Sequence, residues 1–351
     1  MTKDSKISNL KRTSSVPTIS DVARIAGVGA ITVSRFVNGT SYVSVEKQKI
    51  IRAAIKKLGY RPNLAARVLK GQRAKIIGLI IPDLADPFYG KCASAVEDFA
   101  SEQGYMTLIV ASKRDRNLQE KELAMLLGQQ VAGMIIVASV PSGFLRQFAD
   151  SNIPIVGLDQ PIRSVPADEV VVENLDGSHV AVDHLIAHGH KRIACVGYDK
   201  TTYAIGLRIL GYRNTMQLAN LKPEVYEDTE TLEDTLRIVR QWKKSASRPT
   251  AVFSLNNVST RLLLHALREV DLAIPKDIAL IGFDDFEMAS LLTPTVTVVR
   301  QPAIELGTQA ARLLFERIAA TNMPAASLGV KIVLPVEFVI RASCGCPAVT
   351  H

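Results

Sequence analysis

Long apolar runs are missing from this chain of 351 residues, although 47% of its residues are apolar. No run reaches the roughly 18 consecutive apolar residues that a membrane span needs, which excludes an integral membrane protein. Residues 1–17 are polar and basic and lack the apolar stretch of a secretory signal, so we expect no export. Four cysteines are too few for a disulfide framework in a chain of this length, and we expect a protein of the reducing cytoplasm.

Sequence motifs of catalysis are also missing. The chain has no nucleophile-elbow motif and no pair of carboxylates that demands acid–base chemistry. The pair Gly27 and Gly29 is followed neither by the last glycine of a dinucleotide-binding loop nor by the Lys-Ser/Thr of a phosphate-binding loop. We therefore expect no enzyme, no catalytic residues and no cofactor.

Two pairs of potential metal ligands are each incomplete. His184 and His188 are four residues apart on one expected helix, but no Asp, Glu or Cys near them in the sequence completes a ligand set. Cys344 and Cys346 stand near the end of the chain and lack a second pair of Cys or His. The sequence therefore predicts no metal site.

The net charge of +8 is unevenly distributed. Residues 1–75 hold 16 Lys and Arg against 3 Asp and Glu, whereas residues 76–351 hold 26 against 31. Only four of the basic residues lie in the first 17 positions, so most of the excess falls on patterned sequence and not on a solvated tail. A concentrated positive charge of this size is typical of a domain that binds a polyanion, and nucleic acid is the expected partner.

Three short helices are predicted between residues 18 and 60. Thr18 can cap the first helix, and Gly27 permits the positive φ of a sharp turn before the second. The third helix is expected over residues 44–58, with Gly59 as its stop. Two short helices joined by such a turn match a helix-turn-helix.

A generic three-helix bundle is the alternative interpretation of this segment. It explains the apolar positions, but it does not explain the polar and basic face formed by Thr32, Ser34 and Arg35. One more short helix is expected from Asn63 to Gly71. Isolated helices of that length are marginal in water, so we expect it to form only when something docks against it.

From residue 75 onward, strand-like apolar runs alternate with amphipathic segments of helix length. This alternation is typical of parallel sheets with crossover helices, and about 270 residues suit two α/β lobes better than one. The expected strands cover residues 76–81, 106–111, 133–137, 153–158, 192–197, 250–255, 278–283 and 331–338. Open α/β sheets bind ligands at the carboxyl ends of their strands. The polar residues near those ends are Asp86, Asp159, Asn256, Asn257, Asp284 and Asp285.

Several motifs carry a resemblance to a known family. They are TISDVARIAGV at 18–28, TVSRFVN at 32–38, GYRPN at 59–63, DPFY at 86–89, GHKRI at 189–193, GFDD at 282–285 and the pair Gln301-Pro302. In this order, and over residues 18–345, the chain resembles the lactose/galactose-repressor (LacI/GalR) family of bacterial transcription regulators. His184 and His190 recur in that family without a metal role.

The resemblance implies an all-α helix-turn-helix head and a two-lobed α/β body built like the periplasmic sugar-binding proteins. It divides the chain into a basic tail at 1–17, the head at 18–61, a hinge helix and linker at 62–75 and the body at 76–346. One lobe would take residues 76–174 and 302–326, and the other residues 175–300 and 328–346.

The resemblance also assigns the residues that contact double-stranded DNA. Ala30, Ile31 and Arg35 fall at base-contacting positions, where Arg35 can donate two hydrogen bonds to a guanine edge. Thr18, Thr32 and Ser34 fall at phosphate-contacting positions, which orient a protein on DNA without specifying sequence. Leu69 matches a leucine wedge that unstacks a base step in the minor groove. The expected set is completed by Asn38 and Asn63.

Ligand-binding residues are expected in the cleft between the lobes. A sugar needs polar groups for neighbouring hydroxyls and an aromatic face for its C–H surface. Such groups are supplied by Asp86, Phe88, Tyr89, Asp159, Arg208, Asn256 and Asp284. The resemblance implies that Arg208 and Asp284 are the family's most recurrent ligand-binding positions and Asn256 and Asp159 further contacts, and it adds Gln301. The family more often has Asn where this chain has Asp86, and Asp where it has Asn257. For Asp284 and Asp285, capping of a helix after the strand is the alternative role.

The function that follows is a ligand-responsive, DNA-binding transcription regulator, which represses a carbohydrate-utilisation operon and is released by a sugar or polyol. The alternatives are a corepressor-dependent repressor or an activator that responds to a sugar acid, a phosphorylated sugar, a purine or a protein partner. An α/β sugar-processing enzyme with a basic head is a more distant alternative. We expect a homodimer on a near-palindromic operator, and not a tetramer, because no heptad segment follows the last expected strand.

Overall fold

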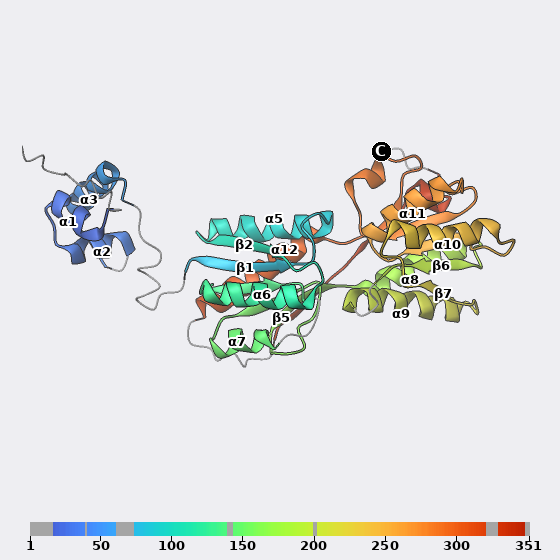
Figure 1. The fold of residues 1–351 in the computed structure, drawn as a ribbon, viewed down its shortest axis with the longest axis horizontal. Coiled ribbons are helices and arrows are strands. Elements are labelled where there is room, and N and C mark those ends of the chain that lie inside the picture. The colour runs from blue at the N-terminus through green and yellow to red at the C-terminus, as the bar shows by residue number, and fades with distance from the viewer. Residues whose placement is uncertain are drawn as a thin grey trace, which may run out of the picture. The chain divides into compact units, whose positions relative to one another are not determined.

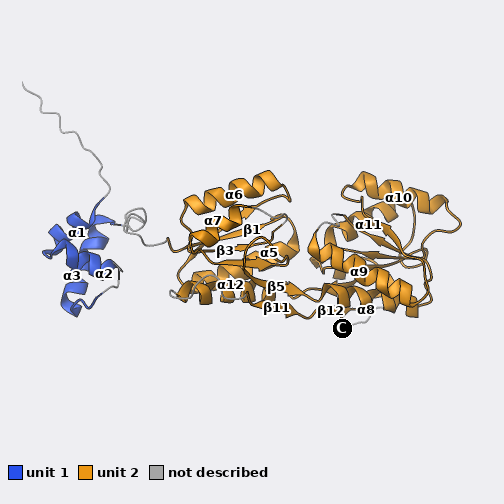
Figure 2. Ribbon diagram, turned by 90° about the horizontal axis from the view of Figure 1, so that it is seen from below, with its two compact units in different colours: residues 1–72 blue, residues 73–351 orange. Residues whose placement is uncertain are grey.

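The computed structural model describes residues 17–38, 41–60, 74–138, 143–198, 202–320 and 329–347. The chain forms two compact units, Met1–Gln72 and Arg73–His351, which are coloured separately in Figure 2. The tail up to residue 16 and the expected hinge helix with Asn63 and Leu69 lie outside the described residues, as does the side chain of Asn38. Among the helices described, none is long and apolar enough to cross a membrane.

The first unit packs three helices around a small apolar core: α1 (Ile19–Ala26), α2 (Ala30–Asn38) and α3 (Val45–Leu58). Thr18 and Asp21 cap α1 reciprocally, because the Asp21 amide donates to Thr18 Oγ1 at 3.3 Å and the Thr18 amide donates to Asp21 Oδ2 at 3.0 Å. Gly27 ends α1 with a φ of 65°, which permits the tight turn into α2. The predicted helix-turn-helix is confirmed.

The first lobe of the second unit is a six-stranded, fully parallel sheet of order β2-β1-β3-β4-β5-β11. Its strands are β1 (Ile76–Ile81), β2 (Met106–Ala111), β3 (Gly133–Ile136), β4 (Ile155–Leu158), β5 (Asp168–Val172) and β11 (Lys331–Leu334). Side chains alternate along β1, so that Ile77 and Leu79 face one layer of helices and Ile80 faces the other.

Helices cover both faces of this sheet (Figure 1). They are α5 (Pro87–Glu102) and α12 (Ala303–Ala319) on one face, and α6 (Arg116–Gly128) and α7 (Phe144–Asp150) on the other. Gly307 permits the close approach of α12 to α5, because a Cβ at this position would lie only 2.4 Å from the carbonyl oxygen of Cys92.

The second lobe repeats this plan with the strand order β7-β6-β8-β9-β10-β12, in which only β12 is antiparallel to its neighbour. Its strands are β6 (Ile193–Val196), β7 (Glu224–Tyr226), β8 (Ala251–Ser254), β9 (Ala279–Phe283), β10 (Thr297–Arg300) and β12 (Glu337–Val339). One face carries α8 (Asn174–Ala187) and α9 (Tyr203–Leu218), and the other carries α10 (Leu232–Lys244) and α11 (Asn257–Glu269). Two short 3₁₀ helices are η1 (Glu287–Ser290) and η2 (Ala342–Cys344).

The chain passes between the lobes after β5, after β10 and between β11 and β12. The single strand expected over residues 331–338 is therefore wrong. Pro335 has no amide hydrogen to donate and interrupts this segment, and its two halves pair with edge strands of different sheets. The other seven expected strands are present with ends shifted by at most two residues, and the predicted fold class is confirmed.

Candidate DNA-binding face and ligand pocket

The outer face of α2 carries the side chains that were predicted to contact bases. Ala30, Ile31 and Arg35 are exposed, and Ile31 keeps 70% of its surface accessible although it is apolar. Val33 on the opposite face is fully buried in the core of the head. The inner face thus anchors α2 while the outer face is available to a large partner.

The predicted phosphate contacts differ in how much the fold itself uses them. Thr32 and Ser34 are half-buried on α2. Thr18 already donates its hydroxyl to Asp21 Oδ2 at 2.7 Å, and a phosphate contact would have to replace that hydrogen bond. Hydrogen bonds from Arg24 and Thr18 lower the pKa of Asp21 to about 2, so the cap is charged over the whole neutral range.

One exposed aromatic residue of the head was missed by the sequence analysis. Tyr42, just before α3, is 87% exposed, which is unusual for a tyrosine without a partner molecule. Two exposed lysines, Lys47 and Lys49, follow on the first turns of α3. The sequence signal for this tyrosine is that it stands in the connection between two expected helices, outside their pattern of apolar residues.

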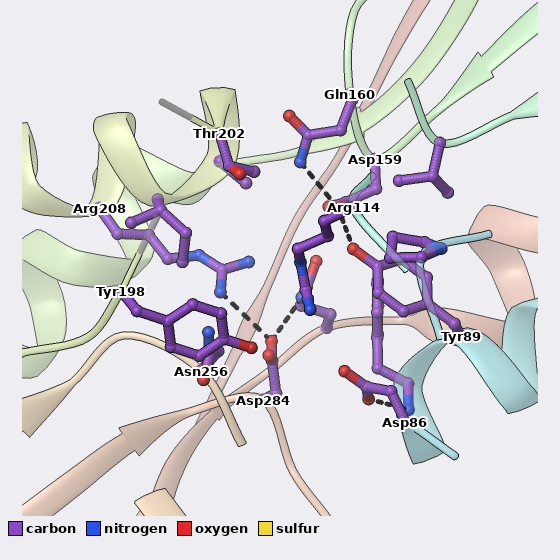
Figure 3. A pocket seen from close by; sticks show the side chains of 16 residues that line it. Asp86, Tyr89, Arg114, Asp159, Gln160, Tyr198, Thr202, Arg208, Asn256 and Asp284 are labelled. Atoms are coloured by element: carbon purple, nitrogen blue, oxygen red, sulfur yellow. Dashed lines mark hydrogen bonds and ion pairs between the residues drawn. The ribbon is translucent and has the colours of Figure 1, made fainter. Parts of the chain in front are cut away.

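A pocket that is partly open to solvent lies between the two lobes at the carboxyl ends of their strands (Figure 3). All eight side chains predicted for a ligand line this interlobe pocket: Asp86, Phe88, Tyr89, Asp159, Arg208, Asn256, Asp284 and Gln301. Eight further lining residues were not predicted: Pro82, Arg114, Val137, Gln160, Tyr198, Thr202, Ala204 and Ile205. Gln160 and Tyr198 lie within two residues of the ends of β4 and β6, so the same strand-end rule could have found them. The structure brings the predicted set together, and their contact with a ligand stays a prediction.

Arg208 lies in the pocket wall with only 3% of its surface exposed, and contacts with the fold hold its guanidinium in place. Its Nε donates to Asn174 Oδ1 at 2.8 Å and its Nη1 donates to the carbonyl oxygen of Leu255 at 2.7 Å. The guanidinium carbon lies 3.7 Å from the centre of the Phe283 ring, and Nη1 lies 3.6 Å from Asp284 Oδ1. These contacts fix the guanidinium before any ligand arrives.

Asp284 follows β9 in the left-handed conformation, with a φ of 71°. Gln301 donates its amide to Oδ1, and the backbone amide of Asn257 donates to Oδ2 at 3.4 Å. Burial raises the pKa of Asp284 above its ordinary value, although the charge of Arg208 and the hydrogen bond from Gln301 act in the opposite direction. The pocket therefore holds this carboxylate at an energetic cost.

The capping role considered for Asp284 and Asp285 is wrong, because Phe286 is the residue that precedes η1. Asp285 instead accepts hydrogen bonds from Arg300 Nη2 at 2.7 Å and from Arg341 Nη2 at 2.8 Å. Burial favours its neutral form, but these two arginines prevail and lower the pKa of Asp285. Asp285 supports the sheet edge and does not line the pocket.

Two buried acceptor atoms at the pocket have no partner among the described residues: Asp159 Oδ1 and Gln301 Oε1. The other carboxylate oxygen of Asp159 accepts from Tyr89 Oη and from Gln160 Nε2, each at 3.0 Å. Burial raises the pKa of Asp159. Buried acceptors are normally hydrogen-bonded, so each of these two atoms can still accept a hydrogen bond from a donor that the described residues do not supply.

The lobes touch each other at the rim of the pocket. Asn257 Nδ2 of the second lobe donates to Asp86 Oδ1 of the first at 2.9 Å. The guanidinium of Arg114 lies 5.3 Å from the centre of the Tyr198 ring across the same gap. Burial, and then the charge of Asp284, raise the pKa of Asp86. The two positions at which the chain departs from the family pattern, Asp86 and Asn257, are thus hydrogen-bond partners.

Comparisons with known proteins agree with this architecture. Residues 18–63 match the family described as bacterial regulatory proteins, lacI family, and residues 182–344 match the periplasmic binding protein-like domain. The transcriptional regulator DegA of Bacillus subtilis is 32% identical over 336 residues, which cover 93% of this chain and 97% of that protein. The ribose operon repressor of Escherichia coli is 33% identical over 311 residues, which cover 87% of this chain and 94% of that repressor.

A crystal structure of the lac repressor dimer, bound to operator and the anti-inducer ONPF, has the same fold with a TM-score of 0.81. It is 26% identical and covers 94% of this chain and 99% of its own. Together, the helix-turn-helix, the two-lobed body and the identity to curated relatives over most of the chain show that this protein belongs to the lacI family of bacterial regulatory proteins.

Proposed function

We propose that this regulator represses transcription from a near-palindromic operator as a homodimer in the cytoplasm, and that a neutral sugar or polyol in the interlobe pocket releases it. Membership of the family supports the regulatory role and the absence of an enzymatic one, since the matched relatives are transcription regulators. The observation that carries the choice of effector is the pair of unpartnered buried acceptors, Asp159 Oδ1 and Gln301 Oε1.

Hydroxyl groups are the donors that such acceptors need. An acceptor that stays buried without a partner costs about 1–3 kcal/mol, so a ligand that supplies two hydroxyl donors gains affinity at both atoms. At neutral pH a carboxylate or phosphate group carries acceptors and essentially no donors. Such a group, placed against these two acceptor atoms, would leave both of them unpaired.

The charge of the pocket also disfavours an anionic effector. Three lining carboxylates, Asp86, Asp159 and Asp284, outnumber the two lining arginines, Arg114 and Arg208. Burial raises the pKa of all three carboxyl groups, because it disfavours their charged forms, and the same desolvation disfavours a further negative charge on the ligand. Sugar acids and phosphorylated sugars are therefore weaker candidates than neutral sugars.

Two relatives guide the remaining choices. The ribose operon repressor makes pentoses the first compounds to test. The lac repressor structure is a dimer on operator DNA, which supports a dimer in which each head contacts one half-site.

The test begins with a duplex selected from a random pool by the full-length protein at low salt. A thermal-shift screen then covers pentoses, hexoses, polyols, sugar acids, phosphorylated sugars and purines. A ligand at about 100 times its Kd adds about 2.7 kcal/mol to the unfolding free energy, a resolvable shift of a few degrees. The hit is finally added to the protein–duplex complex, where fluorescence anisotropy should show release.

The matched variants are Asp159→Asn and Asp98→Asn. Asp159→Asn places an amide NH₂ donor where the unpartnered acceptor Asp159 Oδ1 stands, and it should abolish the rise in melting temperature caused by the ligand. The second changes an exposed carboxylate of α5 and should leave the shift unchanged. An anionic or purine hit would overturn the proposed effector class, tighter DNA binding with the hit would overturn release, and failure to select any duplex would overturn the DNA-binding function.

A further inference from the structure

Two histidines of α8 and two cysteines near the end of the chain come together on the second lobe. Cys346 Sγ lies 3.6 Å from His184 Nε2 and 3.4 Å from His188 Nε2, although 162 and 158 residues separate them in the sequence. The ligand atoms of His184, Cys344 and Cys346 all lie within 4.8 Å of one another. The two incomplete pairs of the sequence analysis are thus one cluster.

Local structure explains how each pair is positioned. Residues four apart on a helix lie one above the other, and the ring centroids of His184 and His188 are 4.4 Å apart, with the ring planes tilted by 36°. After η2, Gly345 adopts a φ of 96°, which turns the chain so that both cysteine sulfurs approach α8. A Cβ at Gly345 would lie 4.0 Å from His188 Nδ1, so the ring of His188 lies directly against this turn.

The separations match those between ligands of one tetrahedral zinc ion. With Zn–S bonds of about 2.3 Å and Zn–N bonds of about 2.0–2.1 Å, a sulfur and a nitrogen ligand are about 3.5 Å apart, and two sulfurs are about 3.8 Å apart. The observed S–N distances of 3.4 and 3.6 Å agree. The 4.8 Å limit on the ligand atoms of His184, Cys344 and Cys346 requires a contraction of at most about 1.3 Å between any two of them. His188 joins these three through its distance to Cys346.

We propose that His184, His188, Cys344 and Cys346 form a Cys₂His₂ site that binds one zinc ion. Sulfur and imidazole ligands in a tetrahedral arrangement select zinc over magnesium or calcium, which prefer oxygen ligands. Four protein ligands close the coordination shell and leave no position for substrate, so the site is structural. The site lies outside the interlobe pocket and does not depend on the proposed function.

The surroundings of the cluster suit such a role. Cys344 is 1% exposed, and Thr297 Oγ1 donates to its sulfur at 3.2 Å, an outer-shell contact of the kind that holds metal ligands in place. His188 is exposed and Cys346 is half-buried, so the ion can enter from solvent.

The ion would tie the end of the chain to α8. Ser343, next to Cys344, already holds this segment to the sheet, because it donates to the Leu280 carbonyl oxygen at 2.6 Å and accepts from the Thr297 amide at 2.8 Å. Zinc adds a link from the same segment to the helix on the sheet's face. We therefore expect zinc to raise the melting temperature of the second lobe.

The experiment uses the full-length protein, reduced, stripped with a chelator and desalted. Titration with Zn²⁺ against a metal indicator should show one equivalent bound per chain, with a rise of several degrees in melting temperature. Co²⁺ in place of Zn²⁺ should give the intense visible bands of a tetrahedral ion and a near-ultraviolet thiolate-to-cobalt band.

Three variants decide between the cluster and adventitious binding. Cys346→Ser and the exposed His188→Gln should each weaken zinc binding by more than the roughly 10–100-fold typical of an outer-shell change. The control His265→Gln removes an exposed histidine of α11 and should bind zinc as the wild type does. His188→Gln keeps the test decisive if the cysteine variant fails to fold.

Three results would overturn the proposal. They are octahedral cobalt bands, equal zinc binding by wild type and His188→Gln, or a reduced protein that takes up no zinc and whose cysteines 344 and 346 only form a disulfide on oxidation. Direct thiol–imidazole hydrogen bonds would then account for the short distances.

Discussion

The head and the interlobe pocket present their candidate binding residues in opposite ways. On α2, Ile31 is 70% exposed, and Arg35 is exposed beside it. In the pocket, Arg208 is 3% exposed and Asp284 is 5% exposed, and both are held by hydrogen bonds of the fold. A DNA surface can complete the contacts of exposed residues, whereas a small ligand needs groups that are already fixed and desolvated. A substitution on the exposed face of the head should therefore change DNA affinity without changing stability, whereas a substitution in the pocket should change ligand affinity and stability together.

The largest effect is expected from removing the pocket arginine, whose contacts serve the fold as well as the pocket. Arg208→Leu leaves Asp284 buried without its counter-charge, and it leaves Asn174 Oδ1 and the Leu255 carbonyl oxygen without a donor. We expect a loss of about 3–5 kcal/mol in the free energy of unfolding. Urea titration followed by the fluorescence of Trp242, the one tryptophan of the chain, measures this loss in the second unit.

The head supplies the matched control for that experiment. Arg35→Leu should leave the same unfolding transition unchanged to within about 0.5 kcal/mol, because Arg35 is exposed. A loss below about 1 kcal/mol for Arg208→Leu would show that the pocket side chains are not part of the fold's stability, and the comparison would then fail.

The second prediction concerns DNA affinity. Arg35→Ala should weaken binding to the selected duplex by about 1–3 kcal/mol, because it removes two donors to a base edge, and should change binding to random DNA much less. Anisotropy titrations with both duplexes at one salt concentration measure the difference. An equal loss on both duplexes would mean that Arg35 contacts only phosphate.

The third prediction concerns the hydrogen bond between Asn257 Nδ2 and Asp86 Oδ1 at the rim of the pocket. Asn257→Asp places two carboxylates side by side and should weaken ligand affinity about tenfold, or about 1.4 kcal/mol. The double variant with Asp86→Asn restores one carboxylate and one amide in reversed order and should recover most of that loss. Calorimetric Kd values for the four proteins form a double-mutant cycle, and purely additive effects would show that the two side chains do not act as a pair.

Much of the fold could be predicted because its patterns are local. Apolar runs with helices between them define seven of the strands, and Thr18 and Gly27 mark the ends of α1. The pairing of residues 331–338 could not be predicted in this way, because two edge strands from different lobes compete for the segment and Pro335 divides it. Partner choice between sheets is a long-range property that periodicity does not contain.

The candidate pocket was partly predictable for the same reason. Strand ends and the family resemblance led to all eight predicted lining residues, whereas Arg114 sits in a turn beyond β2 with no motif around it. The partnership of Asp86 with Asn257 joins residues 171 positions apart, and the histidine–cysteine cluster joins residues 158 positions apart. The sequence singles out these residues only separately, and the fold is what brings them together.

The smallest expected effect is a difference in sign between the two regions on acidification. Hydrogen bonds lower the pKa of Asp21 from 3.8 to about 2, so its contribution to stability is present above pH 3.8 and is lost as the pH falls toward 2. Burial raises the pKa of Asp284, so the folded state binds this proton more tightly and the unfolding free energy gains as the pH falls from neutral through the raised pKa. Asp284→Asn should reduce this rise of the unfolding free energy on acidification, which urea titrations followed by Trp242 fluorescence measure at each pH. Asp21→Asn should reduce the loss of stability of α1 at acidic pH, which hydrogen exchange of the α1 amides measures. If both variants changed the pH dependence with the same sign, the pocket carboxylate would be as well solvated as the helix cap, and the contrast between the two regions would not hold.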